Sequence, residues 1–86
     1  MPEVSRFYGI VIRMYYDEHN PPHFHALHSG QEAQISLDPI GALHGKLSSR
    51  ALSMVIEWAA LHQRELVENW DLMRNDHPPR KIPPLE

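Results

Sequence analysis

The chain has 86 residues, a formal net charge of −3 and no cysteine. This length allows one domain with a modest core, and the lack of cysteine excludes disulfides and thiolate metal sites. The acidic balance argues against non-specific binding of nucleic acid by the whole surface, because displacing counterions from a polyanion needs lysine and arginine.

The first predicted strand covers Arg6–Tyr16, which is rich in aromatic and β-branched residues. Its alternation puts Arg13 and Tyr15 on the face opposite the core, and the predicted core set is Tyr8, Ile10, Ile12, Met14 and Tyr16. A loop follows at Asp17–Pro22, because two prolines remove two backbone donors.

A hairpin is predicted next, with strands His23–His28 and Glu32–Asp38 around a tight reversal at Ser29-Gly30-Gln31. If the loop has two residues, parity fixes which side chains share a face. His23 and His25 then lie on one face with Gln34, Ser36 and Asp38. Phe24 and Ala26 lie on the core face with Ala33, Ile35 and Leu37. We expect the histidine face to be the one that the helices leave bare.

Ala42–Gly45 is a short candidate strand, and a helix with a broad apolar stripe follows at Arg50–Leu61, capped by Ser48 or Ser49. The helical pattern continues to Asn75. We predict a break at His62, because Glu65 follows three residues later as in a capping box, and Leu61 and Leu66 are spaced for a hydrophobic staple. One kinked helix stays open as the alternative.

The predicted fold class is therefore α+β: a three- or four-stranded antiparallel β-meander followed by two helices packed on one face of the sheet. Residues 1–75 form the single compact domain. Residues 76–86 form a proline-rich C-terminal tail, for which disorder and docking on a partner are both open.

Four of the seven histidines fall between residues 19 and 28, which leads to a first hypothesis, a metal site. His23 and His25 are two apart on a strand and project to the same side, as a zinc-type site needs. The candidates for a third ligand are His19, Asp38, Asp17 and Glu18. The cofactor would be a divalent metal such as zinc.

A second hypothesis is acid–base catalysis without a cofactor. His23 and His25 would share proton transfers, Arg13 or Arg6 would stabilise a phosphoryl anion and Tyr15 would position it. This set suits a small nuclease that cleaves RNA through its own 2′-hydroxyl. A third hypothesis is structural: the histidines bond to backbone carbonyls and to Asp38. No general catalytic motif is present, so residue types alone leave all three open.

Three segments resemble one prokaryotic family, the domain of unknown function 4160. They are Arg6-Phe-Tyr-Gly-Ile-Val-Ile-Arg-Met-Tyr, Asn20-Pro-Pro-His-Phe-His-Ala26, and Gly45-Lys-Leu with Arg50-Ala-Leu52, Glu57-Trp58 and Asn69-Trp70. The resemblance covers Val4 to about Met73. It implies a compact α+β domain, often encoded beside a second small protein, the domain of unknown function 2442. His19, His23, His25 and Arg13 match the family's motif positions.

From the resemblance we expect one component of a two-protein toxin–antitoxin-like or regulatory module, with a small partner protein. The chain would act in the cytoplasm, without membrane contact, either by protein binding or as a His-dependent nuclease toxin on RNA. The alternative is a non-catalytic metal-binding or protein-interaction domain that uses the His-rich strand. A homodimer through the outer strand or the Trp70 helix also stays open.

Overall fold

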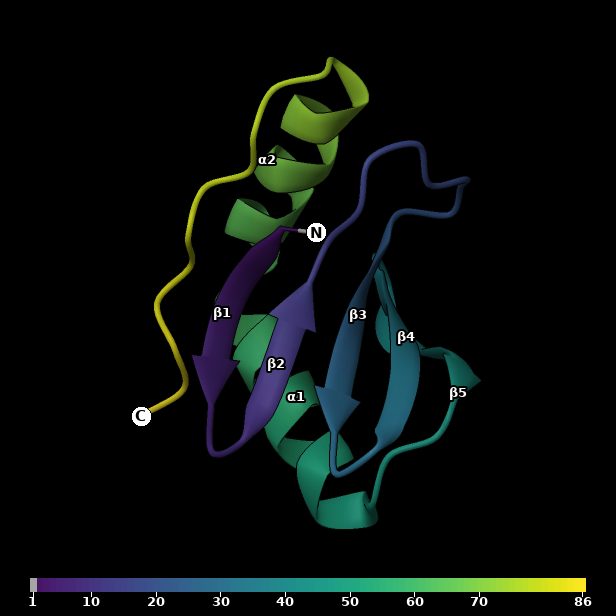
Figure 1. Ribbon diagram of the computed structural model, residues 1–86, viewed down its shortest axis with the longest axis vertical. Helices are drawn as coiled ribbons and strands as arrows, with labels where there is room; N and C mark the ends of the chain where they lie inside the picture. Colours follow the sequence, from purple (N-terminus) through teal and green to yellow (C-terminus); the bar gives the residue numbers. More distant parts are fainter. Residues whose placement is uncertain (1) are drawn as a thin grey trace.

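The computed structural model describes residues 2–86. Five strands precede two helices: β1 (Glu3–Phe7), β2 (Ile10–Arg13), β3 (His23–His28), β4 (Gln31–Leu37), β5 (Ile40–Gly45), α1 (Ser49–Leu61) and α2 (Gln63–Arg74). The strands form one antiparallel sheet in the order β1-β2-β3-β4-β5, and α1 crosses behind it (Figure 1). The predicted α+β meander is confirmed, with five strands in place of three or four.

The prediction of one strand over Arg6–Tyr16 is wrong, because the chain reverses at Tyr8-Gly9. Both residues have positive φ, 50° and 77°, as the two central positions of a type I′ hairpin require. Tyr8 therefore lies at a turn with 62% of its surface exposed, and Tyr16 is also exposed. Gly9 supplies the left-handed conformation, and the apolar residues on either side of it masked the turn in the sequence.

The β3–β4 hairpin has the predicted two-residue reversal, with Ser29 and Gly30 at φ of 50° and 77°. His23 pairs with Ser36 and His25 with Gln34. Directly opposite residues of an antiparallel pair share a face, so the predicted parity is confirmed. It separates the two histidines from Phe24, which is fully buried in the core.

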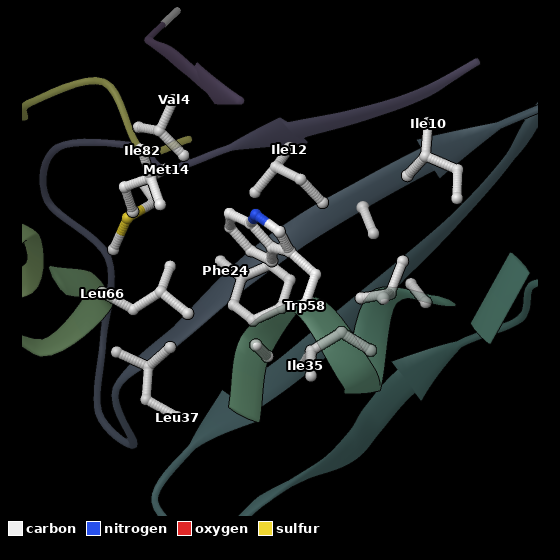
Figure 2. Packing of buried hydrophobic residues seen from close by; sticks show 14 of the residues in the cluster. Val4, Ile10, Ile12, Met14, Phe24, Ile35, Leu37, Trp58, Leu66 and Ile82 are labelled. Carbon is white, nitrogen blue, oxygen red and sulfur yellow. The ribbon is translucent and has the colours of Figure 1, made fainter. Parts of the chain in front are cut away.

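The core lies between the sheet and α1, around Trp58 (Figure 2). Trp58 is fully buried, and its ring centroid lies 5.7 Å from that of Phe24 and 5.4 Å from that of Phe7. α1 begins as predicted, because the Ser48 hydroxyl accepts the Ala51 N–H at 3.2 Å. The helix therefore lies on the core face of the sheet.

The predicted break at His62 is confirmed, since α1 ends at Leu61 and α2 begins at Gln63. The Nδ1 atom of His62 lies 2.5 Å from the Glu65 carboxylate. The predicted hydrophobic staple is wrong: Leu66 is buried, but 66% of Leu61 is exposed. Neither helix is long and apolar enough to cross a membrane, and residues 2–86 contain no other helix that could.

The C-terminal tail packs on its own domain, beside β1 (Figure 1). Ile82 is buried in the core, and its N–H donates to the Val4 carbonyl at 2.8 Å. The Asn69 side chain bonds both backbone groups of Arg80, and the Trp58 indole N–H donates to the Pro83 carbonyl at 2.9 Å. Residues 80–83 are thus held along β1 by hydrogen bonds to Val4, Asn69 and Trp58.

Gly45 and Gly30 form a matched pair for testing the packing of β5 on β4. Both have positive φ, 80° and 77°, but a Cβ at Gly45 would overlap the Glu32 carbonyl oxygen, whereas a Cβ at Gly30 would meet nothing. We expect Gly30→Ala to lower the free energy of unfolding by about 1–2 kcal/mol through backbone strain. Gly45→Ala should cost clearly more, as measured by urea unfolding. Equal losses would contradict the close approach at Glu32.

Candidate metal centre

His23 and His25 project from β3 on the face opposite Phe24, but this face is not bare as predicted. Only 6% of His23 and 7% of His25 is exposed. The Trp70 ring lies 5.5 Å from the His23 ring, and the Tyr15 ring meets His25 edge-on at 4.5 Å. The physical reason is that α2 continues to the end of the sheet where the β2–β3 loop lies (Figure 1).

Glu18 completes a cluster of three ligand-type side chains. It comes from the loop between β2 and β3, and the Oε1 atom of its carboxylate lies 2.5 Å from His25 Nε2 and 3.4 Å from His23 Nε2. The contact with His23 does not meet hydrogen-bond geometry. His23 Nε2 is therefore buried without a hydrogen-bond partner in residues 2–86. Both imidazoles therefore direct the same ring nitrogen toward one carboxylate oxygen.

The Pro21 carbonyl oxygen fixes the tautomer of His23. His23 Nδ1 lies 2.8 Å from this oxygen, and a carbonyl oxygen can only accept, so Nδ1 carries the proton. In the neutral ring the lone pair is then on Nε2, the buried atom without a partner. Leaving such an atom unsatisfied costs about 1–3 kcal/mol, and an electrophile at that position would remove this cost.

His25 is held from its other side by Glu32 of β4. His25 Nδ1 donates to the Glu32 carboxylate at 2.8 Å, and its Nε2 atom faces Glu18. Histidines that ligate metals commonly donate the second ring N–H to a carboxylate or a backbone carbonyl, which orients the ring and raises its basicity. His25 has the first kind of support and His23 has the second.

The three ligand atoms fit a divalent metal of the zinc class. The candidate ligand atoms of Glu18, His23 and His25 all lie within 4.8 Å of one another. Tetrahedral coordination at ordinary zinc bond lengths places ligand atoms about 3.3 Å apart. The Glu18–His23 distance of 3.4 Å already matches, and the shorter Glu18–His25 contact of 2.5 Å would have to lengthen to hold an ion.

The structure brings Arg13 and Tyr15 to the cluster as well. Arg13 is the cross-strand partner of His25, and Tyr15 packs on the same ring. Glu3, the partner of Arg13 on the other side, is occupied by Arg6: two hydrogen bonds join them, and they are the main reason that the pKa of the Glu3 carboxyl is lowered. His23, His25, Arg13 and Tyr15 thus lie together, whereas Arg6, the alternative to Arg13 in the acid–base hypothesis, is paired with Glu3.

His19 and Asp38, predicted as metal ligands, are exposed and do not belong to the three-residue cluster. His19 lines a pocket of about 250 Å³ together with Glu18 and His23. Glu32 was not predicted to take part, although the hairpin parity already placed it on the face of His25. Trp70 was not predicted to take part either, and its contact with His23 depends on the path of α2, which no local pattern in the sequence specifies.

A comparison with protein-family models gives one match, to the model described as Domain of unknown function (DUF4160), over residues 9–71. The chain belongs to this family. No curated protein and no solved structure matches it. The DUF4160 match confirms the resemblance seen in the sequence, and it spans Glu18, His23, His25 and Glu32. It ends before Arg74 and the C-terminal tail.

The tautomer of His23 can be measured directly. We expect long-range ¹⁵N–¹H spectra at neutral pH to show the proton of His23 on Nδ1, because the Pro21 carbonyl accepts it. His77, whose surface is exposed, serves as the reference for a ring without this constraint. A His23 ring protonated mainly on Nε2 would contradict the assignment of the lone pair.

Proposed function

We propose that this domain binds one divalent transition metal ion of the zinc class through Glu18, His23 and His25. The observation that carries the proposal is the buried, unpartnered Nε2 atom of His23, whose lone pair faces the Glu18 carboxylate. Two imidazoles and one carboxylate are a ligand set of zinc hydrolases and of non-haem iron sites, in which at least one coordination position stays open. Three protein ligands therefore support a reactive centre over a closed structural one.

The metal hypothesis accounts for the burial of these polar groups. Removing imidazole and carboxylate groups from water is unfavourable unless each finds a partner. Pro21, Glu32 and the edge of Tyr15 satisfy the outer sides of the two rings, and the inner nitrogen atoms converge. An ion at the point of convergence would give every ring nitrogen a partner.

Elemental analysis tests this proposal on protein purified without a metal-affinity tag. We expect about one equivalent of metal per chain, since a site with three ligands and outer-sphere support binds one ion. Glu18→Gln should abolish the metal content, and Glu32→Gln should weaken affinity about 10–100-fold through the loss of support for His25.

His19→Ala and Asp38→Asn are the matched controls, because both residues were predicted as ligands from the sequence and both lie outside the cluster. They should keep the full metal content. Metal retained in Glu18→Gln but lost in His19→Ala would overturn the assignment of the third ligand. Circular dichroism of each variant separates the loss of a ligand from unfolding.

The acid–base hypothesis is a second candidate, favoured by the position of Arg13 opposite His25 in the sheet and by the packing of Tyr15 on the His25 ring. In this proposal the chain is the toxin of a two-protein cytoplasmic module, cleaves RNA and is neutralised by a small companion such as a domain of unknown function 2442 protein. The burial of both rings counts against it, because an RNA phosphate must reach the imidazole nitrogen atoms.

Expression in a bacterial host tests the toxin proposal. The wild-type chain should arrest growth, and the double variant His23→Ala, His25→Ala should not. Arg13→Ala, which removes a partly exposed side chain outside the core, should relieve the arrest without loss of folding. Normal growth with the wild type, the double variant and Arg13→Ala alike would rule out the toxin proposal and leave the metal proposal intact.

A further inference from the structure

A second pocket borders the cluster on the side of α2. It has a volume of about 180 Å³ and is lined by Tyr15, Asp17, Glu18, Trp70, Met73 and Arg74. By this measure about 10–15 Å³ holds one water molecule. The pocket therefore has room for several waters or one small polyatomic ion.

Half of the residues that line the pocket belong to the cluster or contact it. Glu18 is itself a candidate ligand, Tyr15 packs on His25 and Trp70 packs on His23. A molecule in this pocket would thus lie against the shell of the metal centre.

The charge around the pocket depends on the metal. Three carboxylates surround the cluster and the pocket, from Asp17, Glu18 and Glu32, and two guanidinium groups accompany them, from Arg13 and Arg74. Without an ion the balance is one negative charge, and a bound dication reverses it to one positive charge. The loaded site would therefore attract anions more strongly than the site without an ion.

Arg74 is the cation that faces this pocket. It lies in the last turn of α2 and forms no salt bridge within residues 2–86. A guanidinium group presents donors in a planar fork that fits the oxygens of phosphate or carboxylate. An oxyanion held by Arg74 would reach toward Glu18 and the open coordination position of the ion.

We propose that this pocket binds a small oxyanion, which coordinates the metal with one oxygen atom and pairs with Arg74 through another. The inference rests on the metal-binding function proposed above. It identifies the substrate class of the centre as small phosphate or carboxylate compounds. The arginine selects the charge and geometry of the anion.

Cobalt(II) substitution tests the two steps separately. The protein is loaded with Co²⁺, whose visible absorption bands report the ligand set, and is titrated with inorganic phosphate and, in a second arm, with acetate. We expect new bands on loading and a saturable change with added anion. A tighter response to phosphate would identify a phosphoryl source, and a tighter response to acetate a carboxylate source.

The variants of this experiment isolate the role of the pocket. Arg74→Ala should bind Co²⁺ normally and weaken anion binding by about tenfold or more, as expected for a lost charge-assisted hydrogen bond. Arg74→Lys should retain part of the affinity. Arg64→Ala, an exposed arginine on the same helix that borders a different pocket, should respond as the wild type does.

Each failure has a distinct signature. If no bands appear on addition of Co²⁺, the metal-binding function and this inference both fail. If the bands appear but neither anion changes them, the metal site stands and the inference fails. An anion response that is equal in wild type and Arg74→Ala would show an ion bound to the metal outside this pocket, and it would also overturn the inference.

Discussion

The register of β3 against β4 is the constraint on which the site depends. A two-residue reversal at Ser29-Gly30 pairs His25 with Gln34 and so puts His23, His25 and Glu32 on one face. A shift by one residue would send both imidazoles into the core and Phe24 out of it. The burial of Phe24 against Trp58 opposes that shift, so the packing of the core also fixes the direction of the histidines.

The candidate centre also depends on a second element, the loop that follows β2. This loop carries Glu18 to the two rings and supplies the Pro21 carbonyl that holds His23. A strand and a loop thus contribute the ligands, and α2 closes the site with Trp70. The burial of the two imidazoles lowers the local dielectric constant and so strengthens electrostatic interactions at the site. A buried site of this kind favours binding of an ion over binding of a large substrate.

The sequence predicted the parts of this fold that local rules control. Alternation and parity gave β3, β4 and the shared direction of His23 and His25, and the spacing of His62 and Glu65 gave the helix break. The sequence failed at Tyr8-Gly9, where a single glycine permits a turn that strand propensity conceals. It also left the third ligand open among four residues, because the position of a loop side chain depends on contacts across the fold.

The largest error at the site was the predicted exposure of His23 and His25, which are both buried. Parity shows to which side a residue points, but it carries no information about what covers that side. Trp70 reaches His23 because α2 extends past α1 toward the β2–β3 loop, and the docking of the tail on Asn69 holds this helix at the residue next to Trp70. Long-range packing of this kind produces no periodic signal within a short window of sequence.

The docked tail makes the two edges of the sheet unequal. Beside β1, residues 80–83 lie along the outer edge of the sheet, where the Val4 carbonyl already accepts the Ile82 N–H. Within residues 2–86 no other segment forms a backbone hydrogen bond with the outer edge of β5. The exposed Leu43 side chain lies on this strand. Unpaired ladder groups are where an additional strand adds to a sheet, so β5 is the more open edge for an extension of this sheet by another polypeptide.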